Sequence, residues 1–105
     1  MKKSVTNRGF HSIEFKDKYE RSCSLQESSL ATEPAIWLGV DDANPKVLAL
    51  DARQVGIETN QTTGWIHYPV PSQVSMDTRM HLTQQEVREL LPYLQRFAET
   101  GELLH

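Results

Sequence analysis

Cysteine, glycine and long apolar runs are all scarce in this sequence, and each shortage excludes a class of protein. Cys23 is the only cysteine among 105 residues, so no disulfide can form within the chain and no oxidising compartment is required. The longest apolar run, residues 35–40, is far shorter than the roughly 20 residues that span a membrane as a helix. The five glycines stand singly, which excludes a glycine-rich phosphate loop.

Positive charge is also scarce. The net charge is −3, and binding to nucleic acid in general needs a surplus of cations to neutralise phosphates, so nucleic acid is not an expected partner. Arginine presents a rigid fork of donors that fits carboxylates and phosphates. Of the later arginines we keep Arg79 as a candidate anion contact and interpret the others as solvated surface residues. No lysine follows Lys46, and the cations beyond it are Arg53, Arg79, Arg88 and Arg96.

The first nine residues are basic and polar. Lys2, Lys3 and Arg8 occur there without an acidic residue, and the segment lacks the apolar core of a signal peptide. We therefore expect residues 1–9 to form a flexible basic tail and residues 10–105 to form a single α+β domain. We also expect a cytoplasmic protein without a membrane partner.

Period-two alternation of apolar and polar side chains predicts several short strands. Residues 10–15 and 23–26 alternate on either side of a polar turn, as expected for a hairpin. Residues 35–40 form the clearest strand, and the Asp-Asp-Ala-Asn-Pro turn after them favours a second hairpin with residues 46–50. Two shorter candidate strands follow later in the chain, at residues 65–68 and 78–82.

The C-terminal segment has the features of one long amphipathic helix. Thr83 and Glu86 stand at the spacing of a capping box, and Gly101 stands where a left-handed C-cap is usual. Pro92 interrupts the pattern, and an interior proline predicts a kink. One apolar stripe runs along the helix at helical spacing and consists of Val87, Leu90, Leu91, Leu94, Phe97 and Ala98.

Strands followed by a single helix predict the α+β class, here a small antiparallel sheet with one long C-terminal amphipathic helix packed on one face. Such a sheet has a second face, which must be polar or covered by another chain, because an exposed apolar face promotes aggregation. The face that bears Trp37 is the candidate for such cover. We therefore expect a homo-oligomer, either a dimer or a larger assembly.

No set of residues for catalysis or metal binding is recognisable. None of the four histidines lies at a metal-ligand spacing from another histidine, a cysteine or a carboxylate. Serines are numerous, but no nucleophile-elbow motif surrounds them. Asp41 and Asp42 resemble a carboxylate pair, yet their place in a turn explains them. The sequence thus predicts no catalytic residue, no metal and no cofactor, and it favours a binding module over an enzyme.

The polar segment after the first predicted turn is the most informative for binding. Ser24, Gln26 and Ser28 share one face of the predicted strand, for which a solvated sheet face is the simpler interpretation. The alternative is a ligand site, if Arg79 and His81 lie on the same side, because hydroxyls, an amide, a guanidinium and an imidazole suit a phosphate or nucleotide. Trp37 or Trp65 on that side would stack on a base, although core or interface packing is the commoner role of a tryptophan. The candidate ligand-binding residues are Ser24, Gln26, Ser28, Ser29, Trp37, Arg79 and His81.

Six blocks of the sequence are distinctive. They read Phe-x-Asp-x-Tyr, Cys-Ser-Leu-Gln-x-Ser-Ser, Ala-Ile-Trp-Leu-Gly, Thr-Arg-Met-His-Leu-Thr, Leu-Leu-Pro and Phe-x-x-Thr-Gly, at residues 15–19, 23–29, 35–39, 78–83, 90–92 and 97–101. Together they resemble a family of small phage and prophage proteins over residues 10–103. The resemblance implies a phage accessory function, and it makes the expected cytoplasm that of a bacterial host.

In that setting, small acidic oligomeric proteins often counter bacterial immunity. The most specific interpretation is a sponge, a non-enzymatic homo-oligomer that sequesters a small nucleotide immune signal. Two alternatives stay open: a protein-binding inhibitor of a host defence effector, similar to anti-CRISPR proteins, and a virion or replication accessory protein without a defence role. The sponge requires that the segments at residues 24–29 and 79–81 converge.

Overall fold

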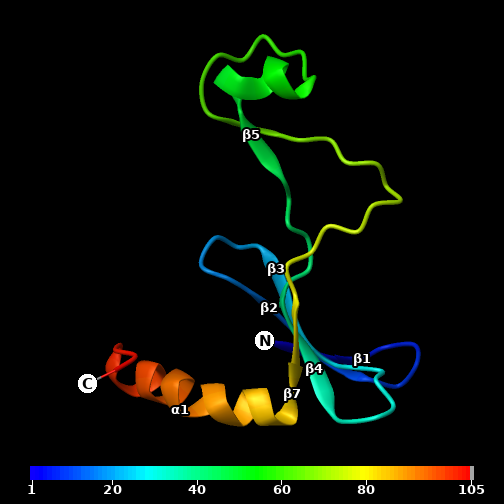
Figure 1. Ribbon diagram of the computed structural model, residues 1–105, viewed down its shortest axis with the longest axis vertical. Coiled ribbons are helices and arrows are strands. Elements are labelled where there is room, and N and C mark those ends of the chain that lie inside the picture. Colours follow the sequence, from blue (N-terminus) through cyan, green and yellow to red (C-terminus); the bar gives the residue numbers. More distant parts are fainter. Residues whose placement is uncertain (105) are drawn as a thin grey trace.

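The computed structural model describes residues 1–104 and consists of two antiparallel sheets and a C-terminal helix (Figure 1). Its elements are β1 (Lys2–Val5), β2 (His11–Lys16), β3 (Ser22–Glu27), β4 (Ala35–Val40), β5 (Lys46–Leu48), the 3-10 helix η1 (Ala49–Val55), β6 (Trp65–His67), β7 (Met80–Thr83) and α1 (Gln84–Thr100). The main sheet has the strand order β1-β2-β3-β4-β7, and β5 pairs with β6 in the second sheet.

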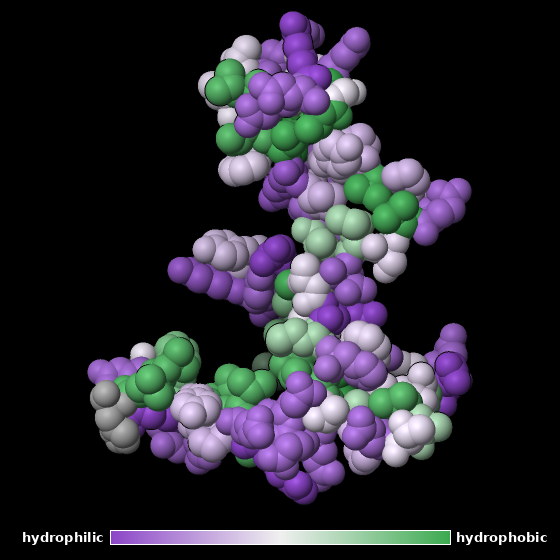
Figure 2. Space-filling view, viewed as in Figure 1, coloured by the Kyte–Doolittle hydropathy of each residue, from purple (hydrophilic) through white to green (hydrophobic). Residues whose placement is uncertain are grey.

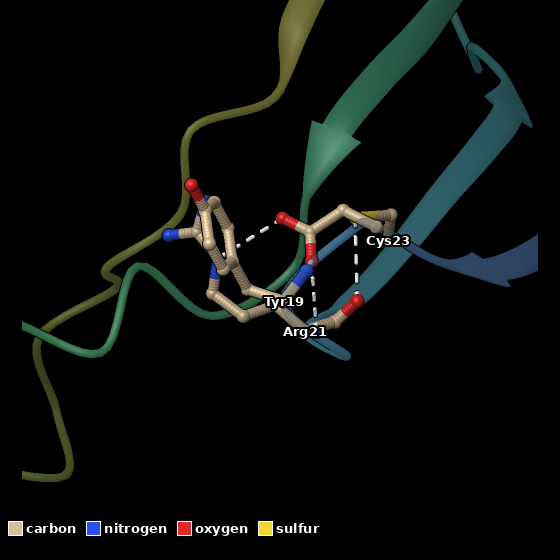
Figure 3. Close-up of polar contacts among 4 residues, drawn as sticks. Tyr19, Arg21 and Cys23 are labelled. Carbon is tan, nitrogen blue, oxygen red and sulfur yellow. Dashed lines mark hydrogen bonds and ion pairs between the residues drawn. The ribbon is translucent and has the colours of Figure 1, made fainter.

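The first predicted hairpin is confirmed as β2 and β3, and an aspartate organises its turn. One carboxylate oxygen of Asp17 accepts hydrogen bonds from the backbone N–H groups of Tyr19 (2.9 Å) and Arg21 (3.0 Å), and the other accepts one from Nε of Arg21 (3.1 Å) (Figure 3). These bonds, above all the one from the Arg21 backbone, lower the pKa of the Asp17 carboxyl. Glu20 completes the turn with a left-handed backbone (φ 64°).

The N-terminal residues form a strand, so the expectation of a flexible tail over residues 1–9 was wrong. β1 pairs with β2 and places Lys3 opposite Ile13. The turn between the two strands is closed by a hydrogen bond from the N–H of Gly9 to the carbonyl of Thr6 (2.9 Å). The basic composition suggested disorder, but lysines are common on edge strands, where they discourage pairing with other chains.

The second predicted hairpin is wrong, because β4 pairs with β3 and β7 and not with β5. β7 offers two apolar side chains in register with β4, with Leu82 opposite Ile36 and Met80 opposite Leu38. Such cross-strand pairs stabilise a sheet, and the three-residue β5 is too short to offer as many. The strand predicted at residues 65–68 is confirmed as β6, which pairs with β5.

The strand register gives the main sheet one polar and one apolar face. Side chains alternate along a strand, so residues directly opposite each other on neighbouring strands share a face. The polar face carries Ser12, Gln26, Trp37 and His81 in one row. The other side, called the apolar face below, is only partly covered. Lys3 and Glu27 also project from it, and its large apolar side chains include Ile13, Phe15, Leu25, Ile36, Leu38, Met80 and Leu82.

α1 begins and ends as the sequence predicts, and the α+β class is confirmed. The Thr83 hydroxyl accepts a hydrogen bond from the N–H of Glu86 (3.2 Å), and the Glu86 carboxylate accepts one from the N–H of Thr83 (3.0 Å). The bond from the Thr83 backbone is the main reason that the pKa of the Glu86 carboxyl is lowered. Gly101 closes the helix with a left-handed backbone (φ 77°), and Pro92 lies inside it.

The helix meets the sheet at β7, and most of its length projects away from the sheet (Figure 1). Val87 in the first turn is half-buried, whereas Leu90, Leu94 and Phe97 are 41%, 55% and 55% exposed. The predicted apolar stripe is therefore present but largely uncovered within a single chain. Among residues 1–104, no helix has both the length and the apolar character needed to cross a membrane.

The single chain is extended and buries few apolar side chains. Those that it buries within residues 1–104 are small, namely Cys23, Ala49 and Ala52. Its radius of gyration is 18.1 Å, whereas a compact domain of this length has about 13 Å. Figure 1 shows the reason, since α1 and the segment from β5 to β6 extend from the main sheet in different directions.

Removal of the capping box is expected to destabilise the protein modestly. Thr83→Ala deletes the hydroxyl that accepts the Glu86 N–H, and the loss of such an N-cap costs about 1 kcal/mol. Urea unfolding at one fixed protein concentration measures the change. Thr62→Ala, in an exposed loop, is the control and should leave the free energy of unfolding unchanged. An equal loss in both variants would contradict the role of the cap.

Candidate functional site

Trp37 occupies the centre of the polar face because β4 has a strand on each side. In the register of the sheet it lies opposite Gln26 of β3 and opposite His81 of β7. All three side chains therefore project from the same face. The sheet thus brings the segments at residues 24–29 and 79–81 together.

Trp37 and His81 form an aromatic stack. Their ring centroids are 3.9 Å apart and their planes are inclined by 5°. The Ser28 hydroxyl lies 2.8 Å from Nε2 of His81, and it also accepts the N–H of Leu30 at 3.1 Å. A hydroxyl both donates and accepts, so Ser28 can serve either tautomer of the imidazole. The stack and the hydrogen bond together fix the position of the imidazole ring.

Arg79 adds a positive charge beside the indole. Its guanidinium carbon lies 5.5 Å from the centroid of the Trp37 ring, which is within cation–π range. Nη2 of Arg79 is 3.6 Å from a carboxylate oxygen of Asp77, a long ion pair, and Nε of Arg79 is enclosed without a hydrogen-bond partner in residues 1–104. The guanidinium therefore retains donors for an anion, which arginine binds by charge-assisted hydrogen bonds.

Gly39 of β4 allows the segment before β7 to approach closely. A Cβ atom at this position would lie 2.5 Å from the carbonyl oxygen of Thr78 and 2.7 Å from Cα of Arg79. The N–H of Thr78 donates to the carbonyl of Val40 (3.1 Å), so the two backbones are in contact here. This glycine thereby permits the position of Arg79 beside Trp37.

Two of the predicted site residues do not join this group. Ser24 is buried, and its hydroxyl donates to the Asp41 carboxylate at 2.5 Å, so it serves the interior of the protein. Ser29 is exposed in the loop after β3, and within the described chain it makes no hydrogen bond to the group. The residues that converge, called the indole cluster below, are Gln26, Ser28, Trp37, Arg79 and His81.

The roles of three residues in or beside the site were missed from the sequence. Asp77 pairs with Arg79 and accepts its backbone N–H at 3.3 Å, and Asp41, interpreted as a turn residue, also holds Ser24. No local pattern distinguishes these two aspartates from other surface aspartates. Gly39 did carry a signal, because a glycine inside a strand often marks a close approach of another backbone.

The indole cluster has the chemistry to bind a planar anion. Stacking of a base on an aromatic ring is worth about 1–3 kcal/mol, and guanidinium, hydroxyl and imidazole groups donate to phosphate. Ser28 and His81 also resemble a nucleophile and its base, but no carboxylate in residues 1–104 hydrogen-bonds to the imidazole of His81 and orients it as a triad requires.

The chain matches no protein-family model, no curated protein and no solved structure.

Proposed function

We propose that this protein is a phage-type accessory protein that sequesters a small nucleotide immune signal without converting it. The convergence of Trp37, His81 and Arg79 on one face of the sheet carries the proposal. The indole cluster offers an aromatic surface for a base, and Arg79 with Ser28 offers donors for a phosphate. The resemblance of the sequence to small phage proteins supplies the setting, the host bacterial cytoplasm.

Sequestration without turnover suits a homo-oligomer. A sponge acts stoichiometrically, so its capacity grows with the number of sites that each particle carries. The net charge of −3 disfavours long nucleic acids, because these require many cations on the protein surface. A single arginine beside an aromatic ring is enough to bind one small anion. The small number of cations therefore favours a nucleotide over a polynucleotide as the ligand.

Titration calorimetry against a panel of cyclic and ADP-ribose-type nucleotides tests the ligand class. We expect the wild-type protein to bind one of them at micromolar protein. Arg79→Ala should weaken binding about 10- to 100-fold, because a hydrogen bond to a charged group contributes roughly 1.5–3 kcal/mol, and Gln26→Ala should weaken it less. Arg88→Ala, an exposed arginine of α1, is the matched control and should bind like the wild type.

A time course distinguishes a sponge from an enzyme. The bound nucleotide should be recovered unchanged when the protein is denatured after a long incubation. Product that accumulates with time would instead identify Ser28 and His81 as a catalytic pair and refute sequestration. Absence of heat with every nucleotide of the panel would refute the ligand class. Circular dichroism of Arg79→Ala should match the wild type, so that lost binding is not lost folding.

A further inference from the structure

We propose that the apolar face of the sheet is covered by α1 of a second copy of this chain, in a reciprocal exchange of helices. The proposal is independent of the nucleotide, because it concerns the face opposite the indole cluster. Each copy gives one helix and receives one, as in a two-fold symmetric interface. The side chains of α1 that lie across the partner's sheet are Leu90, Leu91, Leu94 and Phe97.

The junction between β7 and α1 directs the helix away from its own sheet. β7 ends at Thr83 and α1 begins at Gln84, with no connecting residue between them. A helix that packs on the sheet from which it emerges needs a chain reversal, and such connections usually take two residues or more. The capping box holds Thr83 in an extended conformation (φ −77°, ψ 166°) and so stabilises the outward direction seen in Figure 1.

The first turns of α1 and the apolar face of the sheet meet at a concave corner. Leu82 of the apolar face and Leu90 of α1 line the same hollow at the corner between them. Val87 shares a second hollow, of about 650 Å³, with Leu82 and Ile36. Figure 2 shows apolar side chains on the side of the α1 arm that faces the rest of the molecule. A second chain of the same shape fits such a corner with its own helix.

The exposed area of the chain is large enough for an interface between two copies. Its accessible surface is 8626 Å², whereas a folded monomer of its mass exposes about 6,000 Å². The excess is therefore roughly 2,600 Å² per chain. Obligate homodimers bury about 2,000–5,000 Å² in total over both subunits. The excess is thus large enough for an obligate interface.

Exchange of helices covers both apolar surfaces at once. Pairing of α1 with α1 alone would cover the helix and leave the apolar face in water, at a cost of roughly 25 cal/mol for each Å² of apolar surface. In the α+β class a helix normally covers the sheet, and the exchange forms that contact between chains. Only a second copy supplies the matching helix and the matching sheet together.

Sedimentation of a charge variant tests the role of the helix. Leu94→Glu places a carboxylate at the centre of the apolar stripe and is expected to reduce the oligomer to monomers of 12.0 kDa or to unfold it. Gln85→Glu adds the same charge nine residues earlier, on the opposite side of the helix, and should sediment like the wild type. A wild-type protein that sediments as a monomer at high micromolar concentration would overturn the proposal, as would a Leu94→Glu oligomer of unchanged mass.

Cross-linking identifies the surface that the helix covers. Chains with Leu94→Cys and chains with Leu38→Cys are unfolded, refolded together and treated with a short bifunctional maleimide; the native Cys23 is buried. The exchange predicts a cross-link between the two kinds of chain, and Gln85→Cys in place of Leu94→Cys should give none. Cross-links between Leu94→Cys chains alone would show helix pairing. A link inside one chain that carries both cysteines would show a helix folded on its own sheet. Either result overturns the proposal.

Discussion

Gly39→Val is expected to prevent β7 from joining the sheet and to cost about 3 kcal/mol or more of unfolding free energy, at the upper end for an overpacked site. The first added carbon alone would lie 2.5 Å from the carbonyl oxygen of Thr78. That neighbour is backbone, which cannot move aside as the end of a side chain does. Because α1 is attached to the sheet through β7, the helix would lose its anchor together with the strand.

Equilibrium unfolding in urea, with circular dichroism as the signal, measures this loss. Ala35→Val is the matched control, because it adds the same side chain to the same strand at a half-buried position. Valine favours strands, so this variant should remain within about 1 kcal/mol of the wild type. A Gly39→Val protein as stable as Ala35→Val would show that β4 and β7 do not approach each other as described.

Elements decided by neighbouring residues were predictable from the sequence. The capping box between Thr83 and Glu86 and the left-handed Gly101 depend on a few consecutive residues, and the helix begins and ends at them. The hairpin of β2 and β3 likewise depends on a turn that Asp17 holds together. Capping and turn hydrogen bonds join residues only a few positions apart, so they can be recognised from the sequence alone.

Strand partners were harder to predict, because pairing joins segments that are distant in the sequence. The turn chemistry after β4 favoured a hairpin with the next strand, but the chain leaves the main sheet there, and β5 pairs with β6 instead. β7 pairs with β4 through two apolar cross-strand pairs, although about forty residues separate the two strands in the sequence. β1 was missed for a related reason, since its lysines give a strand at the edge of a sheet the composition of a tail.

The site was predicted in part, and the register decided the rest. Alternation placed Arg79 and His81 on one side of their strand, and the structure has both beside Trp37. Alternation also placed Ser24 on the same side as Gln26, but it does not reveal that the Ser24 hydroxyl donates a hydrogen bond to the Asp41 carboxylate. A sequence period gives the direction of a side chain, whereas the hydrogen-bond partner depends on the neighbouring strand.

The apolar stripe of α1 shows another limit of periodicity. The spacing correctly identified the side chains that avoid water, and it predicted that a sheet would cover them. Spacing contains no information about which chain provides that sheet. The exposed Leu94 and Phe97 and the direct junction at Thr83 supply this information, and only the folded chain reveals them.

Thermal unfolding is expected to depend strongly on protein concentration, because the single chain has almost no apolar interior of its own. When two chains unfold and separate in one step, dilution favours the separated state. With about 0.7 kcal/mol of unfolding enthalpy per residue, a roughly thousandfold rise in concentration should raise the Tm by about 10 °C. Scanning calorimetry at high concentration and fluorescence of Trp37 and Trp65 at low concentration together cover this range.

The capping variant provides the control for this dependence. Thr83→Ala weakens the helix within each chain, so it should lower the Tm at every concentration and leave the slope of 1/Tm against the logarithm of concentration unchanged. A variant such as Leu38→Ala removes apolar surface from the proposed contact between chains. In the same one-step transition it should also lower the Tm at every concentration, and by more than Thr83→Ala does, because a buried Leu→Ala substitution costs about 2–5 kcal/mol. A wild-type Tm that does not change with concentration would mean that one chain folds alone, and the exposed α1 and apolar face would then need another occupant.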